Sequence, residues 1–224
     1  MNKELLRTAH LFAFPEHTIA WEHLARFEYP WESLDTLKNF ILELGPTLPS
    51  DVYECRGDGV YVAKSAKVAP SALIGGPAII CPDAEIRHGA FIRSSAIVGA
   101  GAVVGNSVEL KNCILFDGVQ VPHFNYVGDS ILGYKSHMGA GSVTSNVKSD
   151  KTPVTIRFGE ERVCTGRKKL GAILADFVEV GCNSVLNPGT VIGTHSNVYP
   201  LSSVRGYVPE RSIFKSLDTV VEKR

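Results

Sequence analysis

A bulky apolar residue recurs at every sixth position over a long stretch of the chain, and a second apolar residue, most often alanine, lies two positions before each one. With 44% of the chain hydrophobic, ten such residues in one phase would arise by chance in about 3 of 10,000 trials. A six-residue period is typical of a hexapeptide β-helix. The bulky series is Val62, Val68, Ile74, Ile80, Ile86, Ile92, Val98, Val104, Leu110 and Phe116, and the companion series is Val60, Ala66, Ala72, Ala78, Ala84, Ala90, Ala96, Ala102, Val108 and Ile114.

Strand geometry explains the pattern. Residues two apart on a strand point to the same side, so both members of each pair face inward. A helix cannot produce this period, because six residues rotate the chain by about 240°. We predict an all-β fold in which three short strands per coil form a prism and the coils stack about 4.8 Å apart.

The series restarts in another phase with Val180, Leu186, Ile192, Val198 and Val204. The interval from Phe116 to Val180 is not a multiple of six, so a segment is inserted between the two stretches. We expect an inserted basic loop at about 147–176, with room for a short hairpin, inside a β-helix domain of residues 56–207. A C-terminal tail of residues 208–224 should follow. The basic residues of the loop are Lys148, Lys151, Arg157, Arg162, Arg167, Lys168 and Lys169.

Residues 1–55 do not follow the six-residue period. Apolar residues recur there at helical spacing, and we expect a helix that begins near Pro30 and ends at Gly45 and Pro46. An uncapped solenoid end exposes its core, so this N-terminal helical segment is expected to cap the first coil. A role in oligomerisation is the alternative.

Composition excludes several classes of partner. Basic and acidic residues balance at 23 each, which gives no bias towards nucleic acid or a membrane surface. No run of 18 apolar residues and no secretory signal is present. Five cysteines without C-x-x-C spacing indicate free thiols in a reducing compartment, and therefore a cytoplasmic protein.

The stretch FIRSSAIVGAGAVVGNSVELKNCILFDGVQVPHFNYVGDSILGYKSHMGAGSVTSNV carries an ordered set of polar residues from Arg93 to Asn146. It resembles the acetyltransferase domain of the bifunctional sugar-1-phosphate nucleotidylyltransferase/glucosamine-1-phosphate acetyltransferase family. The resemblance covers roughly residues 60–207. It implies a left-handed parallel β-helix, a homotrimer with sites between neighbouring prisms, and acetyl transfer from acetyl-CoA to an amino-sugar phosphate without a metal. Glucosamine 1-phosphate is the leading acceptor.

The resemblance implies that His123 is the catalytic base. A neutral imidazole with a pKa near 6.5 can take a proton from a sugar ammonium at pH 7, whereas a surface histidine without a role is the alternative. Arg93 and Lys111 match phosphate-binding residues. They are three hexads apart, so the period places them on one face, one coil apart, where an Arg fork and a Lys suit a phosphate. The alternative is two solvated charges.

Tyr126 and Asn146 match residues that contact the sugar, although they could instead pack at an interface and cap a turn. The backbone N–H of Ala140 matches one that faces the thioester carbonyl, as an oxyanion donor would. A tight corner that needs a small residue is the alternative for Ala140. Lys151, Lys168 and Lys169 are candidate contacts for substrate phosphate or coenzyme A, or simply a solvated basic loop.

The chain departs from the family pattern in two places. His137 stands where the family usually has Asn. The sequence also lacks a glycine-rich nucleotide loop, so we expect the nucleotidylyltransferase half of the family to be absent. Two other functions therefore stay open: a non-catalytic β-helix that binds a sugar nucleotide or a protein partner, and an acetyltransferase for a different amino sugar.

Overall fold

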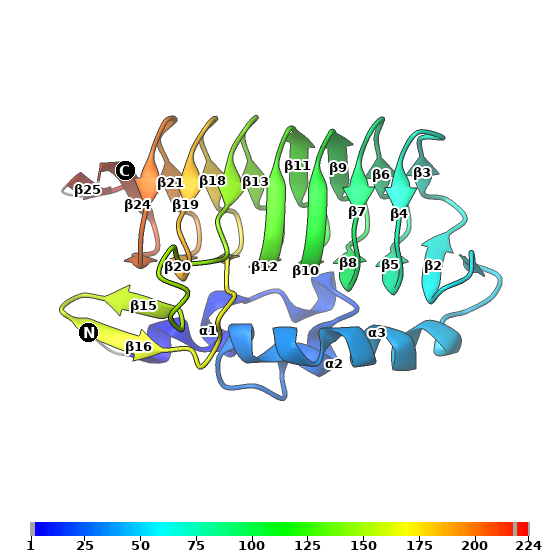
Figure 1. Cartoon of the computed structure of the whole chain (residues 1–224), viewed down its shortest axis with the longest axis horizontal. Helices are drawn as coiled ribbons and strands as arrows, with labels where there is room; N and C mark the ends of the chain where they lie inside the picture. Colours follow the sequence, from blue (N-terminus) through cyan, green and yellow to red (C-terminus); the bar gives the residue numbers. More distant parts are fainter. Residues whose placement is uncertain (1–2, 217–218, 224) are drawn as a thin grey trace.

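Stacked parallel strands form three walls of a β-helix in the computed structural model, which describes residues 3–216 and 219–223 (Figure 1). The predicted β-helix of hexapeptide repeats is confirmed. Wall one contains β2 (Val60–Ala63), β5 (Ala78–Ile80), β8 (Ala96–Val98), the second halves of β10 (Glu109–Leu115) and β12 (Tyr126–Leu132), β17 (Ala172–Leu174), β20 (Thr190–Ile192) and β23 (Tyr207–Val208).

The other two walls are built in the same way. Wall two contains β3 (Lys67–Val68), β6 (Glu85–Ile86), β9 (Val103–Asn106), β11 (Gln120–His123), β13 (His137–Met138), β18 (Glu179–Val180), β21 (Asn197–Val198) and β24 (Ser212–Ser216). Wall three contains β4 (Leu73–Ile74), β7 (Phe91–Ile92), the first halves of β10 and β12, β14 (Val143–Thr144), β19 (Val185–Leu186) and β22 (Ser203–Val204).

The inward residues of successive coils form the core, as the period predicts. In the first coil, however, Val68 and Ile74 are only half-buried. The last pair of the predicted series is wrong: the register places Cys113 and Leu115, not Ile114 and Phe116, next to Ala96 and Val98. The corner before Leu115 is one residue shorter than the corner one coil earlier, and Asn112 turns there with a φ of 50°. Asn tolerates this left-handed conformation better than most residues.

The helices of the N-terminal segment lie along wall one and not over the open first coil, where the sequence predicted a cap (Figure 1). Helix α3 contacts β8, and the 3₁₀-helix η3 contacts β12. The predicted end of the helix at Gly45 is confirmed. The helical elements are η1 (Lys3–Leu6), α1 (Thr8–Leu11), η2 (Pro15–His17), α2 (Trp21–Leu24), η3 (Pro30–Asp35), α3 (Leu37–Leu44) and η4 (Gly45–Thr47).

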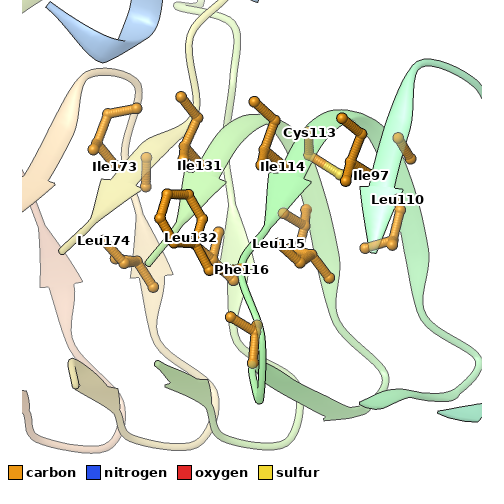
Figure 2. Packing of buried hydrophobic residues seen from close by; sticks show 14 of the residues in the cluster. Ile97, Leu110, Cys113, Ile114, Leu115, Phe116, Ile131, Leu132, Ile173 and Leu174 are labelled. Carbon is orange, nitrogen blue, oxygen red and sulfur yellow. The ribbon is translucent and has the colours of Figure 1, made fainter. Parts of the chain in front are cut away.

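An aliphatic ladder on the outside of wall one explains this placement. Figure 2 shows Ile97, Ile114, Ile131 and Ile173 in one row, on the opposite side of the strands from the inward leucines. All four side chains are fully buried. Burial of each contributes about 1.5–3 kcal/mol relative to exposure, so an uncovered wall one would be costly.

Hydrogen bonds join the segment to the β-helix. The buried Asp176 carboxylate accepts the N–H groups of Ala13 and Tyr134, each at 2.8 Å. Burial raises the pKa of Asp176. Phe12 also stacks on Phe116, with ring centroids 4.9 Å apart, so Phe116 packs against the N-terminal segment.

The inserted segment contains the hairpin for which the sequence left room. Strands β15 (Thr155–Phe158) and β16 (Glu161–Cys164) pair antiparallel, and the chain rejoins wall one at β17, before residue 176. Phe158 packs on Tyr207 with ring centroids 5.1 Å apart. The hairpin therefore covers the end of wall one.

Pairing also continues beyond residue 207, because β24 pairs in parallel with β21. Strand β25 (Thr219–Glu222) then pairs antiparallel with β24, and β1 (Tyr53–Cys55) pairs antiparallel with β2. All five cysteines are free. Among the described residues, no helix combines the length and the apolar character that crossing a bilayer requires.

Candidate active site at the edges of wall three

Wall three carries the mixed outer surface on which most of the predicted site residues lie. Its outward residues on successive coils include Phe91, Glu109, Tyr126 and Val143, which follow one another in register. One edge of the wall carries Arg93, Lys111 and Asn146, and the other carries His123 and Ala140. We call these the cationic edge and the histidine edge.

At the cationic edge, the predicted alignment of Arg93 and Lys111 is confirmed. The Arg93 N–H donates to the carbonyl of Leu110 at 2.8 Å, which places Lys111 one coil beyond Arg93. Arg93 also donates to the Glu109 carboxylate at 2.9 Å, and this hydrogen bond raises the pKa of Arg93. Both cations can therefore reach one ligand, although each already contacts a carboxylate.

Asp129 is the centre of the cationic edge. Its carboxylate is buried and accepts hydrogen bonds from Lys111 Nζ at 3.0 Å, Asn112 Nδ2 at 2.8 Å and Asn146 Nδ2 at 2.6 Å. Asn112, Asp129 and Asn146 occupy the same corner of three successive coils, each 17 residues after the last. We call this row the Asn-Asp-Asn ladder.

Sequence reasoning missed Asp129 and Asn112, although a signal was present. Both have a positive φ, which Asn and Asp adopt more readily than most residues. A 17-residue repeat of Asn or Asp after one shortened corner would have identified the ladder.

Tyr126 joins the cationic edge through Asn146, whose Nδ2 donates to the tyrosine Oη at 3.2 Å. Burial raises the pKa of Tyr126, and the negative charges of Asp129 and Glu109 act in the same direction. The ring lies over Gly128, where an added Cβ would be 2.3 Å from the Oη. Glycine at 128 therefore permits this position of Tyr126.

At the histidine edge, His123 ends β11 and its side chain is exposed. The next coil stacks directly on it, because the Gly141 N–H donates to the His123 carbonyl at 3.0 Å. Among the hydrogen bonds of the described residues, none has the Ala140 N–H as donor. An imidazole and an unpaired N–H are thus one coil apart at the same corner.

Buried Asn125 fixes the histidine edge. Its Oδ1 accepts the His123 N–H at 3.1 Å, and its Nδ2 donates to the carbonyls of Gly139 at 2.8 Å and Ser142 at 3.0 Å. Sequence reasoning also missed this residue. A polar side chain between two strands of a packed β-helix is the signal that would have indicated it.

The two edges do not meet within one chain. Strand β12 crosses wall three between them, and at about 3.3 Å per residue the edges are on the order of 10 Å apart. A surface pocket of about 410 Å³ borders the cationic edge, and His123 does not line it. This pocket, which we call the lysine pocket, is lined by Leu34, Asp35, Lys38, Asn112, Asp129, Gly166, Arg167, Lys168 and Lys169.

Two of the three lysines predicted from the inserted loop, Lys168 and Lys169, line the lysine pocket. The third, Lys151, is exposed and does not line it. Lys38 also lines the pocket and comes from the N-terminal segment, which the sequence gave no reason to connect with the site. Covering wall one has brought α3 to the cationic edge.

His137 lies apart from both edges, on the outside of wall two. Its Nδ1 is 2.8 Å from Glu179 Oε2 on the next coil, and both residues line a pocket of about 370 Å³. The side chain that departs from the family pattern therefore has a carboxylate partner. Within the described part of the chain, no group of three or more His, Cys, Asp or Glu residues could hold a metal ion.

Comparisons with known proteins agree with the repeat pattern. The model of the GMPPB C-terminal domain matches residues 74–199, more than half of the chain. A bifunctional sugar-1-phosphate nucleotidylyltransferase/acetyltransferase of Sulfurisphaera tokodaii is 35% identical over 109 residues, which are 49% of this chain and 27% of that protein. The bifunctional protein GlmU of Methanococcus maripaludis is 34% identical over 120 residues, or 53% and 29% of the two chains.

The chain thus spans less than a third of the length of these curated relatives. Among solved structures, the acetyltransferase domain of PglB from Neisseria gonorrhoeae is 14% identical, with a TM-score of 0.32 over 71% of this chain and 55% of that chain. By the family match over residues 74–199, the chain belongs to the GMPPB C-terminal domain family, and its hexapeptide repeats match the acetyltransferase region of bifunctional sugar-1-phosphate nucleotidylyltransferases.

Proposed function

We propose that the protein is an acetyl-CoA-dependent N-acetyltransferase acting on an amino-sugar phosphate, with glucosamine 1-phosphate as the leading acceptor. The observation that carries this proposal is the register that aligns Arg93 and Lys111 at one edge of wall three. Similarity to bifunctional nucleotidylyltransferase/acetyltransferases supports it.

In this proposal the cationic edge binds the acceptor. Arg93 and Lys111 hold the phosphate, which carries nearly two negative charges, and Tyr126 and Asn146 contact the sugar. Arg93 can give up its contact with the Glu109 carboxylate for a ligand phosphate at little cost, because this ion pair is exposed and therefore weak.

The histidine edge performs the chemistry. The neutral imidazole of His123 accepts a proton from the acceptor ammonium, and the freed amine forms the new N–C bond to the acetyl carbonyl. The Ala140 N–H donates to the oxygen that gains negative charge. The C–S bond then breaks and the thiolate takes the proton that His123 holds. His123, neutral again, accepts the remaining extra proton of the nitrogen and releases it to solvent, so no acyl-enzyme is needed.

A second and third copy of the chain would close the site. The two edges lie on the outside of one prism, and wall three bears exposed apolar side chains at Leu73, Phe91 and Val185. We therefore propose a homotrimer in which a neighbouring prism covers wall three, with the reaction in the cytoplasm.

One observation favours the alternative of a non-catalytic sugar-nucleotide-binding protein. His123 lies outside the lysine pocket, whereas His137 lines another pocket together with its carboxylate partner Glu179. His137 also motivates the acetyltransferase alternative in which the acceptor is a different amino sugar.

Release of free thiol from acetyl-CoA tests the proposal. The acceptors would be glucosamine 1-phosphate, galactosamine 1-phosphate, a nucleotide-linked amino sugar and unphosphorylated glucosamine. Turnover should be fastest with a phosphorylated acceptor. Binding of these ligands without thiol release from any of them would refute the enzyme and favour the binding protein.

A further inference from the structure

The lysine pocket combines residues from three distant parts of the sequence. Leu34, Asp35 and Lys38 come from the N-terminal segment, Asn112 and Asp129 from the Asn-Asp-Asn ladder, and residues 166–169 from the chain that returns after the hairpin. Its volume of about 410 Å³ lies within the range of small-molecule sites.

The charges that line the pocket do not balance. Two carboxylates face four cations, and each carboxylate already has a partner: Asp35 pairs with Arg167, and Asp129 pairs with Lys111. Lys38, Lys168 and Lys169 form no ion pair with any residue that the structure describes. An excess of three lysines around one polar pocket favours an anionic ligand.

The buried side chain of Arg167 also holds the pocket in place. Arg167 is only 8% exposed, and it donates from Nε to the carbonyl of Lys169 at 3.1 Å. Its ion pair with Asp35 joins the returning chain to η3. The N-terminal segment and the basic residues after the hairpin are therefore fixed relative to each other at the cationic edge.

We propose that the lysine pocket binds a phosphoryl group, and that Lys38 makes the N-terminal segment part of the ligand site. Lys38, Lys168 and Lys169 contact the phosphoryl oxygens, which lysine recognises as a point charge. The group has two sources: the acceptor or the phosphates of coenzyme A. Assignment to the acceptor rests on the proposed function, whereas anion binding does not.

Calorimetric titration of the full-length protein tests the proposal without any need for turnover. The ligands are pyrophosphate, glucosamine 1-phosphate, unphosphorylated glucosamine, and adenosine 3′,5′-bisphosphate as the phosphate-bearing fragment of coenzyme A. The test variant is Lys38→Met with Lys168→Met. The matched control is Lys64→Met, because Lys64 is an exposed lysine that does not line the pocket.

The double variant should bind the phosphorylated ligands roughly tenfold more weakly or worse, since two charged hydrogen-bond donors are lost. Binding to wild type should also weaken as salt rises. A loss with glucosamine 1-phosphate assigns the site to the acceptor, and a loss with adenosine bisphosphate assigns it to coenzyme A.

Equal affinity of the double variant and the Lys64→Met control for every phosphorylated ligand would overturn the proposal. Thermal unfolding of the variants distinguishes lost binding from lost folding, and Lys38→Glu alone provides a second test by charge reversal. If wild type binds these anions but transfers no acetyl group, the phosphoryl site is retained and only the proposed function fails.

Discussion

Wall one and wall three are built from the same repeat and have opposite surfaces. In both, the inward residues are small or aliphatic and buried. The outward ladder of wall one is a run of isoleucines, which the N-terminal segment and the hairpin cover. The outward ladder of wall three includes Phe91, Glu109 and Tyr126 and stays open to solvent or to another chain. The inward residues form the core of the β-helix, and the outward residues determine whether a wall is covered by other parts of the chain or stays exposed.

The sharpest test compares two histidines: His123, at the corner where wall two meets wall three, and His137, on the outside of wall two. If chemistry occurs at the edge of wall three, His123→Ala should lower kcat about 10²- to 10⁴-fold, the usual contribution of a general base. His137→Ala on wall two should change kcat less than tenfold. Steady-state thiol release with the best acceptor measures both. The reverse order would transfer the base to the His137–Glu179 pair.

The different surfaces of the two walls predict that truncating an outward aliphatic side chain to alanine lowers the free energy of unfolding more in wall one than in wall three. Ile131→Ala in wall one should lower the free energy of unfolding by about 2–5 kcal/mol, because it leaves a cavity under the N-terminal segment. Leu73→Ala on wall three should cost about 0.5 kcal/mol or less, because Leu73 is 63% exposed. Urea denaturation gives both values. Similar losses would mean that wall three is covered as well.

Lys111 tests whether the cationic edge binds ligand or only stabilises Asp129. Lys111→Met should weaken acceptor kcat/KM about 10- to 100-fold and also destabilise the fold, because Asp129 loses a charged partner. Adding Asp129→Asn should restore stability without restoring kcat/KM. Recovery of kcat/KM in the double variant would assign Lys111 a purely structural role.

The smallest expected effect concerns pH and the segment that covers wall one. Burial lowers the pKa of His23 below its ordinary value of 6.5, and its Nε2 donates to the Ser33 carbonyl at 2.9 Å. The unfolded chain therefore binds this proton more readily, so stability is complete above pH 6.5 and falls as the pH drops towards the folded pKa. Burial lowers the pKa of His195 in the same direction.

His23→Phe should reduce the loss of unfolding free energy between pH 7 and pH 5 without abolishing it, since the lowered pKa of His195 contributes in the same direction. Urea denaturation at several pH values measures the slope. A slope equal to that of wild type would mean that His23 does not couple the segment to pH.

The repeat pattern predicted the coil and the alignment of Arg93 with Lys111, because inward burial and strand register follow directly from the period. It failed at Ile114 and Phe116, since one missing residue at a corner shifts the phase without changing the composition. It also did not predict that the helices of the N-terminal segment lie along wall one. The outward isoleucines 79, 97, 114, 131 and 173 were visible in the sequence, but their role depends on which wall they share.

The site was harder to predict. The resemblance implies site roles for His123, Arg93 and Lys111, and these stay predictions. Asp129 and Asn125 act through contacts between coils that one strand alone does not reveal. Lys38 was harder still to predict, because nothing in the local sequence indicates that α3 begins beside the cationic edge. Such placements come from tertiary packing and not from sequence spacing.

The Asn-Asp-Asn ladder has a mechanical consequence. Where neighbouring coils are joined only by backbone hydrogen bonds, they can shift relative to one another, and the β-helix can bend or stretch along its axis. The hydrogen bonds from Asn112 and Asn146 to Asp129 join three consecutive coils and restrict this deformation at one corner. The cationic edge, where we propose that the acceptor binds, should therefore keep its geometry while a ligand enters and leaves.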